Sequence, residues 1–203
     1  MVTQSNVHSY HAPEVPPRLP RRGNWLSRSI GKFFLLLLRW KGVGELPNVN
    51  KCVLIVAPHT SNWDFVIGIS IYLAYGIDGH WFGKHTIFKS TFGKLLKWLG
   101  GIPVERKAQH GFVEQLIEMF KESDQMILAL SPEGTRKKTK HWKKGYYYIA
   151  LGAKVPIFLV SLDYKRRELE FGPLITPNGN YEEQAAEIKA YYNTKTPKKP
   201  DLF

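Results

Sequence analysis

KCVLIVAPHTSNWD, residues 51–64, decides the fold class of this chain. The apolar run at 51–57 has the length of one strand and shows no polar alternation, which predicts a strand buried on both faces. Pro58 follows it, and Ser61 is a good N-cap residue ahead of a second apolar run that ends near Tyr75. A buried strand, a short turn and a helix over 62–75 together form the repeating unit of an α/β protein.

The turn in this stretch carries His59 five residues before Asp64. A carboxylate that holds one imidazole nitrogen makes the other nitrogen a good proton acceptor, so this pair could activate a hydroxyl of the substrate as a general base. Residues five apart on one helix point about 140° apart, so the two side chains meet only if His59 precedes the helix and Asp64 lies in its first turn. The alternative is that Ser61-x-x-Asp64 is a capping box and His59 an ordinary loop histidine. This stretch alone leaves both interpretations open.

The rest of the chain repeats the alternation of short apolar runs and helical patterns. We expect strands at 80–83, 101–105, 126–130, 155–162 and 169–171, and helices at 91–99, 108–123, 145–153 and 181–193. The predicted core residues of helix 108–123 are Phe112, Leu116, Ile117 and Phe120. A chain of 203 residues with 43% hydrophobic composition suits one globular domain, here over 46–193. The expected fold class is α/β, with a mostly parallel central sheet flanked by helices.

The two ends of the chain differ from this domain in composition. Residues 1–23 are rich in proline and arginine, which predicts a flexible arm without packed structure, and residues 194–203 predict a polar tail. Between the arm and the domain, residues 24–45 place Trp25, Ile30, Phe33 and Leu37 near helical spacing among mostly positive charges. This pattern favours an amphipathic helix lying in the headgroup layer of an anionic membrane. A helix docked on the protein core is the alternative.

The charge balance narrows the class of partner. The chain has 29 Lys+Arg against 17 Asp+Glu, a net charge of +12, which favours nucleic acid, an anionic membrane surface or a phosphorylated substrate. Cys52 is the only cysteine, so an intrachain disulfide cannot form, and we expect a small buried hydrophobic residue. No secretory signal is evident, and the apolar run at 33–38 is much shorter than the ~20 residues that span a bilayer. We therefore expect a peripheral protein on the cytoplasmic face of the membrane.

Two further segments place an arginine just after a predicted strand. SPEGTR, residues 131–136, leaves the carboxyl end of strand 126–130, where α/β sheets gather their ligands. Gly134 would let backbone N–H groups approach an anion, and Arg136 would add a forked donor suited to phosphate. GIPVER, residues 101–106, ends in the same way on Arg106. Taken alone, either arginine is more often an ordinary surface charge.

In this order and spacing, the segments resemble the glycerolipid acyltransferases typified by bacterial 1-acylglycerol-3-phosphate acyltransferase. The resemblance covers roughly residues 50–162 and depends on four blocks, at 59–64, 101–106, 132–136 and 155–157. It implies transfer of a fatty acyl group from acyl-CoA or acyl carrier protein to the free hydroxyl of a lysophospholipid such as 1-acylglycerol-3-phosphate, in phospholipid biosynthesis. A thioester donor is already activated, so no cofactor is implied.

The resemblance also implies a role for each matching residue. His59 would be the general base and Asp64 the residue that orients it. The residues implied in substrate binding are Ser61, Arg106, Glu133, Gly134, Thr135 and Arg136. Pro58 and Ser131 depart from the asparagine and the aromatic residue common at these positions, so the acceptor could be a lysolipid with another headgroup. We expect no metal site, because His80 and His85 lack further ligands at a suitable spacing.

The basic loop at 136–144 keeps two rival functions open. Together with Tyr146, Tyr147 and Tyr148, it could belong to a nucleic-acid-binding module, although the apolar segment near the N-terminus and simple core packing of the tyrosines count against this. A hydrolase or thioesterase, with water in place of the lipid hydroxyl, is the second rival. The chain has no Gly-x-Ser-x-Gly elbow that would support a serine hydrolase.

Overall fold

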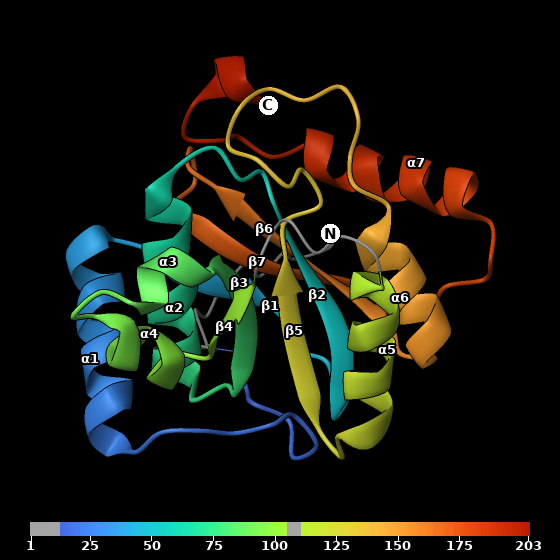
Figure 1. Ribbon diagram of the computed structural model, residues 1–203. Coiled ribbons are helices and arrows are strands. Elements are labelled where there is room, and N and C mark those ends of the chain that lie inside the picture. Colours follow the sequence, from blue (N-terminus) through green and yellow to red (C-terminus); the bar gives the residue numbers. More distant parts are fainter. Residues whose placement is uncertain (1–12, 105–110) are drawn as a thin grey trace, which may run out of the picture.

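The computed structural model describes residues 13–104 and 111–203, and these form a three-layer α/β sandwich (Figure 1). One sheet of seven strands has the order β1-β7-β6-β2-β5-β3-β4. The strands are β1 Lys41–Gly44, β2 Lys51–Ala57, β3 Gly79–Lys84, β4 Gly101–Val104, β5 Met126–Leu130, β6 Ile157–Asp163 and β7 Glu168–Ile175. The helices are α1 Trp25–Leu38, α2 Asn62–Tyr75, α3 His85–Phe88, α4 Gly93–Trp98, α5 Phe112–Glu122, α6 Gly145–Ala153 and α7 Tyr181–Asn193, followed by the short 3₁₀ helix η1 Pro200–Leu202.

The sheet is mostly parallel, as the alternation of elements predicted. β2 lies at its centre and pairs in parallel with β5 on one side and with β6 on the other. β3 and β4 continue the parallel arrangement beyond β5. β6 and β7 form an antiparallel hairpin, and β1 lies parallel to β7 at the outer edge. The carboxyl ends of β2 and β5 therefore lie at the same edge of the sheet, next to each other.

Helices cover both faces of the sheet, and each face has its own hydrophobic core. Val53 and Ile55 of β2 point toward α5, α6 and α7, where Leu116 and Phe120 are buried as expected. Cys52, on the opposite face, lies in the core shared with α1 and α2. Burial raises the pKa of the Cys52 thiol to about 12, so this residue is a small buried hydrophobic group. The prediction of a strand covered on both faces is confirmed.

Helix α1 packs on α2 through one narrow face. Ser27, Gly31 and Leu35 are the buried residues of α1, spaced one turn apart. A Cβ atom at Gly31 would lie 2.3 Å from the backbone nitrogen of Ala74, so the two helix backbones are in direct contact. The large apolar side chains point outward, with Trp25 76% exposed and Leu36 78% exposed. The helix expected over 24–45 spans only Trp25–Leu38, because β1 occupies 41–44, and most of its apolar side chains face away from the core.

The described part of the N-terminal segment is packed, contrary to the flexible arm that we expected for 1–23. Leu19 is buried in the core beside α1 and α2. The Arg22 N–H donates a hydrogen bond of 2.9 Å to the Gly76 carbonyl, and Arg21 forms a β-bridge with Ile77. The expectation was wrong because prolines and arginines dominate the composition of this segment, whereas its single leucine fills a core position. Residues 1–12 lie outside the described residues.

The C-terminal segment is also ordered, whereas a polar tail was expected from 194 onward. The Lys195 ammonium forms a 2.6 Å ion pair with Glu170, and the Thr196 carbonyl accepts a 2.8 Å hydrogen bond from the Tyr164 N–H. Phe203 is partly buried and packs against the core that includes residues of α6 and α7. Strand β1 was missed for a different reason, since its sequence KGVG has two glycines and gives little strand signal.

Candidate active site

His59 and Asp64 lie beside each other, in the turn and the helix that follow the carboxyl end of β2. His59 Nδ1 lies 3.3 Å from Asp64 Oδ2, with the histidine side chain 27% exposed and the aspartate side chain 1% exposed. His59 precedes α2 and Asp64 lies in its first turn, which is the arrangement that the five-residue spacing required. Solvent can thus reach the imidazole, while the carboxylate behind it is shielded. A pair of this kind can orient an imidazole for proton transfer.

Asp64 also belongs to the cap of α2, so the capping box and the histidine–aspartate pair are both present in the structure. Asp64 Oδ2 accepts a 2.7 Å hydrogen bond from the Ser61 N–H, and Ser61 Oγ accepts a 3.2 Å hydrogen bond from the Trp63 N–H. These contacts belong to a capping box at the start of the helix. The same oxygen that satisfies the Ser61 N–H faces His59. Ser61 is buried, and its observed contacts are those of a helix cap.

Tyr164 contacts the other carboxylate oxygen of Asp64. Its hydroxyl donates a 2.5 Å hydrogen bond to Asp64 Oδ1 from the turn between β6 and β7. Burial, together with the hydrogen bond to the charged Asp64, raises the pKa of the Tyr164 phenol well above its usual value. The phenol therefore stays a proton donor. Sequence reasoning missed this residue, because no spacing rule connects positions 64 and 164.

Glu133 contacts the turn that carries the histidine. Glu133 Oε1 accepts a 2.8 Å hydrogen bond from the His59 backbone N–H, and the residue is only 3% exposed. Desolvation raises the pKa of the Glu133 carboxyl, although the His59 N–H bond opposes this shift. This carboxylate thus fixes the position of the His59 backbone. The geometry gives it a clear structural task, in addition to the substrate-binding role that the resemblance implied.

The loop after β5 brings the remaining residues of SPEGTR to the same edge of the sheet. Gly134 has φ +64°, a left-handed conformation that favours glycine, and Thr135 Oγ1 accepts a 3.1 Å hydrogen bond from the Lys137 N–H. Arg136 is exposed, and within residues 13–104 and 111–203 its guanidinium has no hydrogen-bond or ion-pair partner. It is therefore available to an anionic ligand. Arg106 lies outside the described residues.

The C-terminal segment passes over this edge of the sheet. The Lys199 N–H donates a 3.2 Å hydrogen bond to Thr60 Oγ1, in the turn next to His59. The Lys198 ammonium lies 4.8 Å from the centre of the Trp63 ring. A cavity of about 260 Å³ beside the segment is lined by Glu133, Lys140, Trp142, Lys189 and Phe203, among others. The segment thus places the Lys198 ammonium near the candidate site, and its Phe203 lines the cavity.

The structure bears on the metal-ligand and tyrosine patterns considered in the sequence. Across 13–104 and 111–203, no group of three His, Cys, Asp or Glu side chains is arranged to hold a metal ion. Tyr146 and Tyr147 are buried in the core at 3% and 0% exposure, so their rings are not available for stacking on bases. Core packing thus accounts for Tyr146 and Tyr147, whereas Tyr148 is 46% exposed.

Comparison with known structures agrees with the α/β fold. The fold resembles the crystal structure of the 1-acyl-sn-glycerophosphate (LPA) acyltransferase PlsC from Thermotoga maritima, with a TM-score of 0.61 and 20% sequence identity. The match covers 83% of this chain and 76% of that chain. A search of curated protein sequences finds no match.

A family model for acyltransferases matches residues 39–163, which is more than half of the chain. The chain therefore belongs to the acyltransferase family. The matched region includes His59, Asp64 and the SPEGTR loop, and it ends one residue before Tyr164.

Proposed function

We propose that this acyltransferase moves a fatty acyl group from a thioester to the free hydroxyl of a lysophospholipid such as 1-acylglycerol-3-phosphate. The observation that carries the proposal is the 3.3 Å approach of His59 Nδ1 to the shielded Asp64 carboxylate at the end of β2. The guanidinium of Arg136 is exposed at the same edge and has no partner among the described residues, which supports an anionic acceptor headgroup. A lysolipid with another headgroup is the second candidate, since a guanidinium also binds other phosphorylated groups.

In the proposed reaction, His59 Nε2 removes the proton of the acceptor hydroxyl while Asp64 stabilises the imidazolium that forms. The hydroxyl oxygen attacks the thioester carbonyl and gives a tetrahedral intermediate. The carbon–sulfur bond then breaks, and the imidazolium returns its proton to the thiolate. The products are an ester and a free thiol, and neither a covalent enzyme intermediate nor a cofactor is needed.

We propose that the acceptor's phosphate is bound at the loop after β5. Gly134 and Thr135 supply backbone groups and a hydroxyl there, and Arg136 supplies the charge. Arg106 would join them, as the resemblance to glycerolipid acyltransferases implies. The donor in this proposal is acyl-CoA or acyl carrier protein, whose phosphates and acidic surface suit the basic loop at 136–144.

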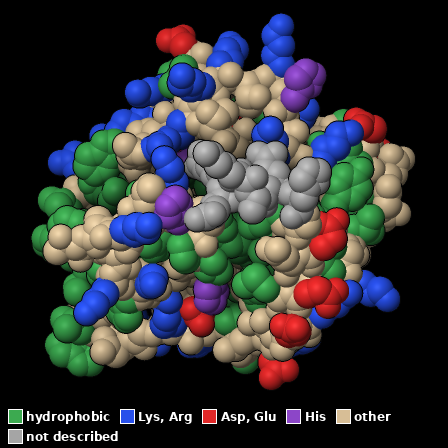
Figure 2. All heavy atoms as spheres, in the orientation of Figure 1, with side chains coloured by type: hydrophobic (Ala, Val, Ile, Leu, Met, Phe, Trp, Pro, Cys, Tyr) green, Lys and Arg blue, Asp and Glu red, His purple; other side chains and the backbone are tan. Residues whose placement is uncertain are grey.

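We further propose that the enzyme works at the cytoplasmic face of a membrane as a peripheral protein. Trp25, Leu36 and Leu37 of α1 are exposed, and so are Phe92 and Trp98 near α4. Figure 2 shows apolar side chains interleaved with Lys and Arg on the left of the molecule, where α1 and α4 lie, while Asp and Glu gather at the lower right. Apolar side chains surrounded by cations suit a layer of anionic headgroups. Among the described residues, no helix is long and apolar enough to cross a bilayer.

The test is to incubate the purified protein with a panel of lysolipids and with both donor types, and to identify the products by mass spectrometry. The proposal expects a diacyl product, and at least a ~100-fold lower rate for His59→Ala, the size expected when a general base is removed. His85→Ala, on α3, is the matched control and should keep the wild-type rate. Release of free fatty acid without an ester product would instead indicate a hydrolase. Full turnover by His59→Ala would refute the role of His59 as the base.

A further inference from the structure

We propose that Tyr164 is a positioning residue of this active site, which holds the Asp64 carboxylate in the orientation that His59 needs. The inference rests on the proposed function, because it assigns a task within the same proton transfer. Tyr164 lies outside the matched family region, in the turn that joins β6 to β7.

The contacts of Asp64 account for both of its oxygens. Oδ2 faces His59 Nδ1 at 3.3 Å and accepts a hydrogen bond from the Ser61 N–H at 2.7 Å. Oδ1 accepts its bond from the Tyr164 hydroxyl at 2.5 Å. A carboxylate attached by one oxygen alone could rotate about its carbon–carbon bond. Donors on both oxygens fix its plane, and with it the distance from Oδ2 to the imidazole.

Tyr164 is itself held on three sides. Its ring meets the Trp40 ring edge to face, with the ring centres 4.8 Å apart. Its backbone N–H donates a 2.8 Å hydrogen bond to the Thr196 carbonyl of the C-terminal segment. The Lys198 ammonium lies 5.8 Å from the centre of its ring. Packing and hydrogen bonds thus fix the ring before any substrate arrives, which is the condition for precise positioning.

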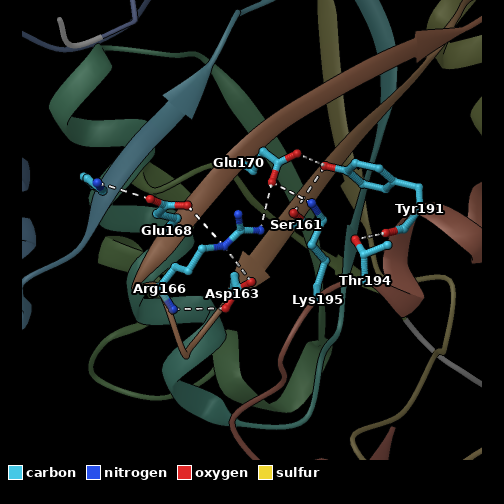
Figure 3. Close-up of polar contacts among 9 residues, drawn as sticks. Ser161, Asp163, Arg166, Glu168, Glu170, Tyr191, Thr194 and Lys195 are labelled. Carbon is cyan, nitrogen blue, oxygen red and sulfur yellow. Dashed lines mark hydrogen bonds and ion pairs between the residues drawn. The ribbon is translucent and has the colours of Figure 1, made fainter. Parts of the chain in front are cut away.

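A network of charged side chains braces the hairpin that carries Tyr164 (Figure 3). Arg166 Nε contacts Asp163 Oδ2 at 3.0 Å and Glu168 Oε2 at 3.5 Å, across the turn. Glu170 on β7 forms an ion pair with Lys195, at 2.6 Å, and this pair ties the hairpin to the C-terminal segment. The β6–β7 hairpin that carries Tyr164 and the C-terminal segment that contacts it are therefore attached to each other.

The direction of the hydrogen bond also has a chemical effect. Burial and Asp64 raise the pKa of the Tyr164 phenol, so the phenol keeps its proton and donates a hydrogen bond to the carboxylate. This donor offsets part of the negative charge that faces the imidazole. Without this donor, the carboxylate would present a larger negative charge to the imidazole. The charged or titratable groups around this carboxylate are His59, Glu133 and Tyr164, with Lys198 beyond the phenol ring.

The test is Tyr164→Phe in the full chain, which removes one oxygen and keeps the ring against Trp40. With saturating acyl-CoA and a lysolipid acceptor, kcat should fall about tenfold, the loss expected from one hydrogen bond to a charged group, while both KM values stay within about twofold. The acidic limb of the kcat/KM profile should also move to higher pH, because the carboxylate is left with fewer donors. A residue that only supports the fold would not move this limb.

Tyr191→Phe is the matched control, because the Tyr191 hydroxyl contacts Ser161 Oγ at 3.2 Å and donates to the Glu170 carboxylate at 3.4 Å, away from Asp64. It should leave kcat and the pH profile unchanged. In substrate-free protein, the proton NMR spectrum should show a downfield exchangeable hydroxyl signal that is absent in Tyr164→Phe and present in Tyr191→Phe. Absence of this signal in the wild type, or equal kcat and equal pH profiles for wild type and Tyr164→Phe, would overturn the inference. A wild type that makes no ester with any acceptor would instead contradict the proposed function itself.

Discussion

Asp64 receives hydrogen bonds from Ser61 and Tyr164 and at the same time faces His59. The sequence could predict the local part of this arrangement, because a capping box and a histidine–aspartate pair are both matters of short spacing. It could not predict the part that Tyr164 supplies. That contact spans 100 positions in the sequence and depends on how the β6–β7 turn packs. Glu133 is a similar case, since its motif was recognised while its bond to the His59 N–H was not.

At the residue scale, Glu133 gives a prediction about stability and pH. Glu133→Gln keeps an oxygen for the His59 N–H and removes a buried charge, whereas Glu133→Ala leaves that N–H without a partner, at a cost of about 1–3 kcal/mol. The folded-state pKa of Glu133 is raised above its usual 4.5, so its contribution favours folding below this pH and is lost as pH rises through the folded-state value.

Glu133→Gln should therefore gain melting temperature relative to wild type when the pH is raised from about 4 to about 7.5, a range that covers the ionisation of a carboxyl with a raised pKa. Thermal unfolding followed by circular dichroism at both values measures this difference. An equal difference at the two pH values would show that Glu133 does not titrate differently in the folded protein. Glu133→Ala, measured alongside, should melt lowest at both.

At the scale of single elements, the contact between α1 and α2 depends on the absence of a side chain at Gly31. A Cβ there would meet the Ala74 nitrogen at 2.3 Å and the Ser70 carbonyl oxygen at 2.7 Å, and neither backbone atom can move freely. Gly31→Ala should therefore destabilise the protein by about 1–3 kcal/mol, although alanine favours helix elsewhere. Urea unfolding gives the value.

Gly68 on α2 is the matched control for this substitution. A Cβ at Gly68 has nothing within 4 Å, so Gly68→Ala should stabilise the protein by about 0.5–1 kcal/mol through helix propensity alone. Equal effects of the two substitutions would contradict the close approach of α1 and α2.

The outer face of α1 gives a prediction about membrane binding. Trp25 and Leu36 are more than three-quarters exposed, and inserting each into the acyl boundary contributes about 1.5–3 kcal/mol. The double variant Trp25→Ser, Leu36→Ser should thus bind anionic phosphatidylglycerol vesicles at least about tenfold more weakly in co-sedimentation. Leu174→Ser, which removes an exposed apolar side chain of β7, should bind as the wild type does. Undiminished binding of the double variant would exclude α1 as the membrane contact.

Prediction from sequence was most accurate where an element has strong end signals. α2 runs from Asn62 to Tyr75 as predicted, because Ser61 caps its start and Gly76 adopts a left-handed conformation at its end. The boundaries of β2, β5, α6 and α7 were also predicted to the residue. β1 and the four-residue helix α3 were missed, since elements of this length show no periodicity.

At the scale of the whole molecule, the fold class followed from the alternation of elements, but the positions of the two ends did not. Leu19 and Phe203 lie in polar, proline-containing segments, and composition predicted that both segments would be unpacked. The burial of Leu19 and the partial burial of Phe203 depend on which surfaces the completed sheet leaves open. Local sequence carries no information about those surfaces, and so the order of the C-terminal segment could not be foreseen.

Removal of residues 198–203 tests the importance of this segment. The truncation deletes Lys198, the Lys199 N–H bond to Thr60 and the Phe203 packing, and should cost about 1–3 kcal/mol of stability. It should also raise the KM for the substrates, because a cation and one wall of the cavity beside Glu133 are lost. Melting temperature and steady-state kinetics measure both effects. An unchanged KM in a stably folded truncated protein would confine the segment to a structural role.

The bonds of Tyr164 to Thr196 and of Thr60 to Lys199 also bear on the synthesis of the chain. His59 and Asp64 leave the ribosome early, whereas residues 196–199, which contact the turn and Tyr164, are translated much later. A nascent chain can complete β2 and α2, yet the surroundings of the proposed active site stay incomplete until residues 196–199 have emerged. Catalytic competence should therefore appear only after these residues have left the ribosome.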